Sequence, residues 1–392
     1  MSNLKKVIVL DAGFSAWPLI KELSKRSISV MVVGNRADDP AHLSGLQNVT
    51  SVNMDYSDFD RVNEYCLREQ IDMAIPGCTD LSYECANALD INKQFDWADS
   101  QTTIQAISDK VILSEVLNDL GVAQPKFSHE PLGQRCLRKP RSGFSGIGIS
   151  SGDSAAASEI SASDERYFFQ ECLEGSLHSC SLLVSSGFPV LLAHIDEFCF
   201  NDNYRVNFSY ISRLDTNVKR EAEEQTLALA KELDISSGVL HCQFIWDGSN
   251  VYIIDVARRC PGDLYGLLIQ RGYGVNYYDK LIGTYLGDMQ EVVSGCSEVD
   301  LCQWRATMTE EDIYLPVRIP NAEDIRDLSI FSLGSAFGLR HKGAKDRASI
   351  LFGKLHEDAN LREFGYELTH SNQCKKVLGS SGCDTKRERR LW

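Results

Sequence analysis

Apolar runs and amphipathic segments alternate over the first hundred residues. Every position of 7–10 is apolar, which predicts a strand buried on both faces. Within 17–25, Leu19, Ile20 and Leu23 have the spacing of one helix face. The pattern continues with strands at 28–33 and 71–75 and a helix at 58–69. This alternation predicts an α/β domain with a parallel, doubly wound sheet over residues 1–105.

The sequence of the turn after the first strand distinguishes a dinucleotide-binding fold from other α/β domains. Residues 11–16 read Asp-Ala-Gly-Phe-Ser-Ala, with a single glycine, Gly13. A dinucleotide-binding fold places three spaced glycines in this turn. Gly13 is explained by the tight turn alone. The sequence therefore argues against an NAD-dependent enzyme.

A second unit is predicted over 106–298. We expect Ser108 to cap a helix that runs to about Leu120, with Gly121 ending it before Pro125. The other elements predicted here are a strand end with a glycine-rich loop at 138–148, a short strand at 168–173, a helix at 221–233, and strands at 241–246 and 251–256. The last two strands would form a hairpin across Asp247-Gly248.

The pattern changes near residue 299. Short strand-like runs at 328–333 and 349–352 predict a small C-terminal domain over 299–378, and the fold class expected for the whole chain is α/β plus α+β. Glycine and serine followed by charged residues predict a mobile tail at 379–392.

The composition agrees with several folded domains, and the net charge argues against some classes of partner. At 392 residues and 43% hydrophobic, the chain is too long for one core, so two or three domains are expected. Lys and Arg number 40 against 55 Asp and Glu, a net charge of −15. Such a balance opposes non-specific binding to nucleic acid or to an anionic membrane, so we expect neither partner.

Cysteine usage indicates a reducing compartment. The thirteen cysteines are odd in number and irregularly spaced, and we expect most of them to be small buried thiols. The segment 1–6 is short and polar and leads directly into the first strand. Nothing approaches the roughly 18 unbroken apolar residues of a membrane helix. These features predict a cytoplasmic protein.

Candidate chemistry begins at Lys139 and the loop 142–148, Ser-Gly-Phe-Ser-Gly-Ile-Gly. Glycines let backbone N–H groups close around phosphate oxygens, and a lysine beside them adds positive charge. Taken alone, the loop is equally compatible with a flexible surface hairpin. The loop is not an isolated motif, however, because Lys110 lies about thirty residues upstream and the strand 168–173 about thirty downstream. An extended segment with apolar walls suits an adenine ring, although the same walls suit ordinary core packing.

The predicted hairpin carries a third group of polar residues. Alternation places Gln243 on the face of His241, and Asp255 on one face with Ile253 and Ala257. Oxygen ligands on neighbouring strands suit Mg²⁺, which is usually held together with nucleotide phosphates. Arg259 would face charge that develops on a transferred phosphoryl group. The alternative interpretation is an exposed hairpin with solvated charges.

Taken in order, these motifs resemble the ATP-grasp superfamily over about residues 5–290. The resemblance implies a Rossmann-like preface domain and an ATP-grasp domain with a glycine-rich lid at about 125–190. It further implies that Lys110 and Lys139 hold the α and β phosphates of ATP, and that Ser145 and Gly146 close over them.

The hinge of that family is similar to residues 169–175, Phe-Gln-Glu-Cys-Leu-Glu-Gly. By this resemblance adenine contacts fall on Gln170, Glu171 and Leu173. His178 stands next to the position where the family often has a glutamate that contacts ribose. It is the candidate for that role, with a partly buried surface histidine as the alternative.

The family commonly has Glu on the first metal strand and Glu-x-Asn-x-Arg on the second. This chain has Gln243, then Asp255, Ala257 and Arg259. The resemblance implies ATP and Mg²⁺ as cofactors, with Mn²⁺ as a second option, Gln243 and Asp255 as metal ligands, and Arg259 with Lys139 as catalytic residues.

The segment 258–265 resembles the carbamoyl-phosphate-synthase branch, which implies a ligase that joins a carboxylate to an amine through an acyl phosphate. Two alternatives stay open: carboxylation through carboxyphosphate, and a nucleotide-binding protein with little or no turnover. Either way the partners would be small molecules. The oligomeric state stays open too, with a homodimer among the possibilities. No protein nucleophile is required, and Cys260 is interpreted as a packed thiol.

Overall fold

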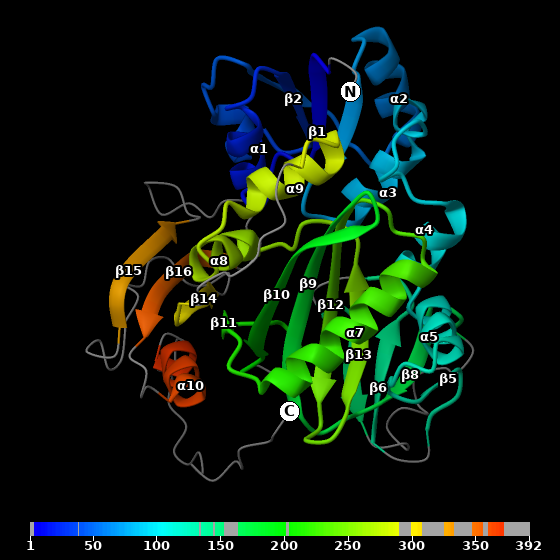
Figure 1. The fold of residues 1–392 in the computed structure, drawn as a ribbon, viewed down its shortest axis with the longest axis vertical. Helices are drawn as coiled ribbons and strands as arrows, with labels where there is room; N and C mark the ends of the chain where they lie inside the picture. Colours follow the sequence, from blue (N-terminus) through cyan, green and yellow to red (C-terminus); the bar gives the residue numbers. More distant parts are fainter. Residues whose placement is uncertain are drawn as a thin grey trace, which may run out of the picture.

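The computed structural model describes residues 4–37, 39–132, 135–143, 146–152, 164–200, 204–289, 299–307, 325–332, 347–355 and 360–371 (Figure 1). The strands are β1 (Lys6–Leu10), β2 (Ser29–Gly34), β3 (Val49–Asn53), β4 (Met73–Pro76), β5 (Phe127–Ser128), β6 (Cys136–Pro140), β7 (Ser150–Gly152), β8 (Tyr167–Glu171), β9 (Ser176–Ser185), β10 (Phe188–Phe198), β11 (Phe208–Ile211), β12 (Gly238–Trp246), β13 (Val251–Ala257), β14 (Leu301–Thr307), β15 (Ile325–Ser332) and β16 (Arg347–Leu355). The α-helices are α1 (Trp17–Leu23), α2 (Phe59–Arg68), α3 (Asp80–Ala88), α4 (Gln101–Ser108), α5 (Lys110–Asp119), α7 (Thr216–Glu232), α8 (Tyr265–Gly272), α9 (Tyr277–Leu286) and α10 (Leu361–Ser371), and 3-10 turns occupy η1 (Pro40–Leu43) and η2 (Asp90–Asn92).

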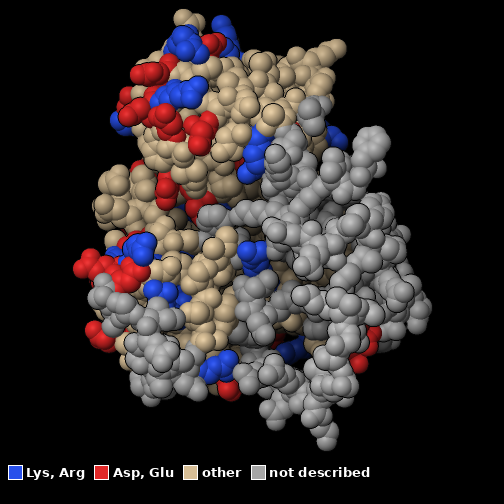
Figure 2. Space-filling model, turned by 180° about the vertical axis from the view of Figure 1, so that it is seen from behind, with Lys and Arg blue, Asp and Glu red and all other residues tan. Residues whose placement is uncertain are grey.

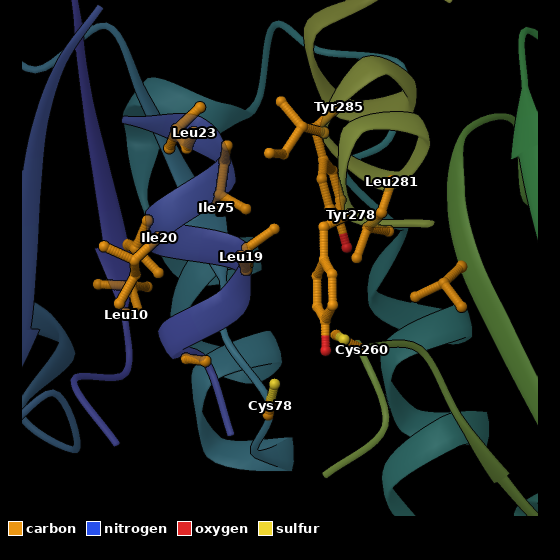
Figure 3. Close-up of a cluster of buried hydrophobic side chains, with 14 of the residues drawn as sticks. Leu10, Leu19, Ile20, Leu23, Ile75, Cys78, Cys260, Tyr278, Leu281 and Tyr285 are labelled. Carbon is orange, nitrogen blue, oxygen red and sulfur yellow. The ribbon is translucent and has the colours of Figure 1, made fainter. Parts of the chain in front are cut away.

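The N-terminal strands form the predicted parallel sheet, in the order β3-β2-β1-β4. β1, β2 and β4 are almost entirely buried because helices cover them, as the unbroken apolar run of β1 indicated, whereas the edge strand β3 is partly exposed. One core cluster continues from this sheet into α8 and α9, which come much later in the sequence. Figure 3 shows Leu19 of α1 extending toward Tyr278 of α9, and Leu23 and Tyr285 belong to the same cluster.

Two buried charges also join the N-terminal part to the central sheet. The Arg258 side chain is 2% exposed and that of Asp99 3%, and they form an ion pair of 2.8 Å. The guanidinium donates in addition to the carbonyl oxygens of Val239 at 2.7 Å and Ser237 at 3.0 Å. Arg258 therefore ties the segment before α4 to β12 and β13.

The central sheet has eight strands in the order β13-β12-β9-β10-β11-β14-β16-β15. The helix α7 lies against β9, β12 and β13 (Figure 1). The predicted C-terminal runs fall in β15 and β16, and through β14 these strands extend the central sheet. Phe364 and Leu368 of α10 pack against this part of the sheet. The limits 299–378 stay a prediction, and the predicted tail at 379–392 lies outside the described residues.

A smaller sheet of four antiparallel strands, in the order β5-β8-β6-β7, covers 127–171. It occupies most of the predicted lid at 125–190. The next strand, β9, pairs with β10 and β12 in the central sheet. The lid sheet therefore ends between β8 and β9.

Two local predictions were wrong. Asp109, not Ser108, caps α5: its carboxylate accepts from the N–H of Val111 at 2.9 Å, while Ser108 ends the unpredicted helix α4. The pairing of β12 with β13 shifts register between Gln243 and Phe244. Ile253 consequently packs in the same core cluster as Val256, away from the face of Asp255.

The charges on the surface and the apolar character of the described helices are relevant to the predictions about nucleic acid and membranes. On the face in Figure 2, acidic and basic side chains lie side by side over the N-terminal part of the chain. Within the described part of the chain, none of the helices combines the length and apolar character needed to cross a membrane. The described cysteines are free thiols, and most of them are buried, as predicted.

Candidate active site

Lys110 and Asp255 meet between the start of α5 and the strand β13. The Asp109 cap begins α5 at Lys110, whose N–H also donates to the carbonyl oxygen of Arg141 at 2.9 Å. Lys110 Nζ donates to Asp255 Oδ1, with side chains 14% and 35% exposed. Burial alone would raise the pKa of Asp255, but the charges of Lys110 and Lys139 bring it below its usual range. Asp255 is therefore an ionised carboxylate at neutral pH.

Lys139 enters the same group from the lid sheet. It lies on β6, opposite Phe168 of β8, and is 5% exposed. Its Nζ donates to Gln170 Oε1 at 2.9 Å and to the carbonyl oxygen of Ile254 at 3.4 Å. Burial lowers the pKa of Lys139 to about 8, and the neighbouring charge of Lys110 contributes to this shift. Two predicted phosphate ligands and one predicted metal ligand thus converge.

The lowered pKa of Lys139 predicts a pH dependence of nucleotide binding. Its ammonium is charged below a pH of about 8 and neutral above it, so ADP affinity should fall as pH rises through this value. The fall should approach about tenfold per pH unit. Calorimetric titration of ADP between pH 7 and 10 measures it.

Lys139→Arg should remove this decline, because a guanidinium keeps its charge over the whole range. Lys126→Arg, at an exposed position just before β5, is the control and should keep the wild-type profile. A decline that persists unchanged in Lys139→Arg would contradict the assignment.

Arg259 lies just beyond β13 and is held by Asp80 at the start of α3, with Nε 2.8 Å from Oδ1. Burial alone would lower the pKa of Arg259, but Asp80 and Asp255 raise it overall. Burial, together with the charge of Arg259, lowers the pKa of His241 to about 3, so this imidazole is neutral at pH 7. Arg259, held by α3, therefore adds a third cation near Asp255.

Gln243 is the direct neighbour of Asp255 across the hairpin. Its Nε2 donates to Glu197 Oε2 on β10 at 2.6 Å, and Glu197 Oε1 accepts from Ser179 Oγ at 2.9 Å. Burial raises the pKa of Glu197, while Arg305 and these two donors oppose the shift. The predicted metal position thus belongs to a buried polar row.

The row continues to β14. Arg305, which is 3% exposed, donates to Ser209 Oγ at 2.8 Å and to Gln303 Oε1 at 2.9 Å. Sequence reasoning missed both Glu197 and Arg305. The available signal was a charged residue inside a mostly apolar segment, since such a residue is rarely buried without a partner.

The predicted hinge residues lie at the end of β8 and just after it, and the predicted lid residues follow β6. Gln170 is buried and accepts from Lys139, whereas the N–H of Glu171 donates to the carbonyl oxygen of Lys126 at 2.8 Å within the lid sheet. Leu173 is half-buried just after β8. Gly146 has φ +68°, a left-handed conformation that favours glycine, while Ser145 lies outside the described residues. Their contacts with adenine and phosphate stay predictions.

His178 lies on the opposite face of β9 from Ser179, because alternate residues of a strand point to opposite sides. It is buried, its Nδ1 is 2.6 Å from Asp196 Oδ1, and its Nε2 is 2.6 Å from Ser176 Oγ. The ring stacks on Phe244. The histidine is thus held inside a polar group of its own, and its proposed ribose contact stays a prediction.

The residues present fit a magnesium ion that arrives with a nucleotide. Gln243 and Asp255 offer two hard oxygen ligands on adjacent strands, and Lys110 and Lys139 offer cations for phosphates. In the described ranges, no group of three or more His, Cys, Asp or Glu side chains is placed to hold a metal by itself. Phosphate oxygens would therefore have to complete the coordination, as is usual for Mg²⁺.

The parallel sheet, the lid sheet and the central sheet, with cations and oxygen ligands converging between them, define a mixed α/β protein with a candidate nucleotide site. Residues 107–263 match the family model described as an ATP-grasp domain. The match supports an ATP-grasp domain in this part of the chain, as its motifs predicted.

Solved structures share the fold at low sequence identity. The L-amino acid ligase from Bacillus licheniformis is 14% identical with a TM-score of 0.74, over 95% of this chain and 98% of that one. N5-carboxyaminoimidazole ribonucleotide synthetase from Staphylococcus aureus, complexed with ADP, is 16% identical with a TM-score of 0.70, over 93% and 97%.

The biotin carboxylase domain of Hydrogenobacter thermophilus 2-oxoglutarate carboxylase, in complex with MgADP and bicarbonate, is 15% identical with a TM-score of 0.71, over 94% and 89%. No curated protein matches the chain in sequence.

Proposed function

We propose that the protein is an ATP-dependent carboxylate-amine ligase that forms an amide through an acyl phosphate. The observation that carries the proposal is the convergence of Lys110, Lys139 and Asp255, which come from three separate elements. Two ammonium groups and a carboxylate within one site suit a magnesium-bound triphosphate. The first similar structure named above, an L-amino acid ligase, supports the amide-forming reaction over others.

The chain's own residues act mainly through charge and position. Lys110 and Lys139 would bind phosphate oxygens, and Arg259 would stabilise charge that develops as the γ-phosphoryl group moves to the substrate carboxylate. Mg²⁺, held by Gln243 and Asp255, would neutralise phosphate charge in the same transfer. The new carboxylate O–P bond replaces the bond to ADP. An amine then attacks the acyl carbon, phosphate leaves, and the amine loses its proton.

No protein nucleophile enters this scheme. Cys260 is 1% exposed and packs beside Cys78 and Tyr278, as Figure 3 shows, so it is a poor candidate for covalent chemistry. Carboxylation is the second candidate, since the fold is shared with a biotin carboxylase domain bound to bicarbonate. A protein without turnover is the third, because Gln243, Asp255 and Ala257 depart from the family pattern.

Release of ADP from ATP and Mg²⁺ separates the three candidates. We expect release only when a carboxylate and an amine are both present, tested with pairs of amino acids and sugar acids. Bicarbonate should have no effect, and Lys139→Ala should abolish release while Lys126→Ala should not. Bicarbonate-dependent release would favour carboxylation instead. Tight ADP binding with no release for any pair would favour the protein without turnover.

A further inference from the structure

Glu197 is a buried carboxylate that directly contacts a predicted metal ligand. It is 3% exposed, and each of its oxygens accepts one hydrogen bond, from Ser179 Oγ and from Gln243 Nε2. The Ser179 hydroxyl is in turn hydrogen-bonded to the Tyr265 hydroxyl of α8. The carboxylate is therefore held in place by β9 and β12, which lie on the same side of β10 in the sheet, and, through Ser179, by a helix.

This contact determines which end of the Gln243 amide faces which neighbour. A carboxylate can only accept hydrogen bonds, so the group that meets Glu197 at 2.6 Å must be the amide nitrogen. The amide oxygen is then the end that remains for a cation beside Asp255, which lies directly opposite on β13. Without Glu197, either end of the amide could turn toward the metal position.

We propose that Glu197 is a positioning residue, which orients Gln243 as an oxygen ligand for the magnesium ion of the bound nucleotide. The inference rests on the proposed function, because it assumes that a magnesium nucleotide binds between Gln243 and Asp255. Glu197 itself would not touch the ion. It would act through its hydrogen bond to Gln243, which joins β10 to β12.

The same contact explains why glutamine stands where related proteins commonly have glutamate. Two carboxylates 2.6 Å apart would repel each other, and one would have to take up a proton. With Glu197 two strands away on β10, an amide at position 243 keeps a single negative charge and a matched hydrogen bond. Outer partners of metal ligands commonly act in this way.

Exchanging the two side chains tests the proposal. In Glu197→Gln, the new amide can donate to the Gln243 oxygen and turn the Gln243 nitrogen toward the metal position. We expect the strengthening of ADP binding by Mg²⁺ to fall by about tenfold, a typical effect for such outer partners. ADP affinity without Mg²⁺ should change by less than about twofold, because Glu197 contacts no predicted phosphate ligand.

The double variant Glu197→Gln/Gln243→Glu should restore the effect of Mg²⁺. Its hydrogen bond has the donor and acceptor reversed, and a carboxylate oxygen again faces the cation. The control is Glu223→Gln on α7, which faces His194 on the other side of the sheet at 3.6 Å. Isothermal titration of ADP with and without Mg²⁺ measures all variants, and thermal unfolding checks that each one is folded.

Glu197→Gln with a wild-type response to Mg²⁺ would overturn the proposal. A double variant that binds no better than Glu197→Gln would do the same, since loss without rescue indicates a purely structural role. If Glu197→Gln does not fold, the double variant must show a larger Mg²⁺ effect than Gln243→Glu alone. A wild-type protein that binds no ADP at all would instead refute the proposed function, and this inference with it.

Discussion

Replacing Asp255 with alanine is expected to lower the rate of ADP release by about 10²- to 10³-fold, the range for removing one charged group that stabilises a transition state. The side chain neutralises Lys110 and lies directly opposite Gln243. Its loss would remove a metal ligand and leave the Lys110 and Lys139 ammonium groups without the carboxylate between them. The measurement is the steady-state rate at saturating ATP and Mg²⁺.

Two matched variants make the result specific. Asp255→Glu keeps the carboxylate and restores the residue common in the family, so it should retain most of the activity. Asp119→Ala, at the exposed end of α5, should leave the rate unchanged. Equal rates in Asp255→Ala and Asp119→Ala would show that Asp255 has no part in turnover.

Replacing Arg258 with methionine should cost about 3–5 kcal/mol in the free energy of unfolding, the usual penalty for breaking a buried ion pair from one side. Asp99 would remain buried without its partner, and the carbonyl oxygens of Val239 and Ser237 would each lose a donor. Unfolding in guanidinium chloride, followed by fluorescence, measures the change.

Arg220→Met on the exposed side of α7 is the comparison, and its effect should stay within about 0.5 kcal/mol. Arg258→Met/Asp99→Leu should recover part of the lost stability, because it removes the unpaired charge. A loss below about 1 kcal/mol in Arg258→Met would contradict the prediction, because the ion pair would then contribute little to the free energy of unfolding.

Local pattern and resemblance were sufficient for much of the fold and for part of the candidate site. The apolar run of β1 predicted a covered parallel strand, and Asp247-Gly248 predicted the turn of the hairpin, which the structure confirms. The convergence of Lys110, Lys139 and Asp255 was expected from the order of motifs along the chain. Each of these features depends on neighbouring residues or on a spacing visible in the sequence.

The remaining features depend on pairings between distant strands. Glu197 meets Gln243 only because β10 and β12 both pair with β9, and Arg305 joins the row only because β14 pairs with β11. No local pattern encodes that order. At the start of α5, Ser108 and Asp109 are both good capping residues, and the choice follows from Ser108 belonging to α4.

The pairing of β11 with β14 has a practical consequence for fragments of this protein. A chain cut near residue 298 would keep the family-model match at 107–263. It would lose β14, the strand that pairs with the outer edge of β11. The uncovered N–H and C=O groups of β11 would offer a template for strands of other molecules, which promotes aggregation. Expression for biochemistry should therefore retain the segment through α10, whose Phe364 and Leu368 shield the aromatic side chains of the same region.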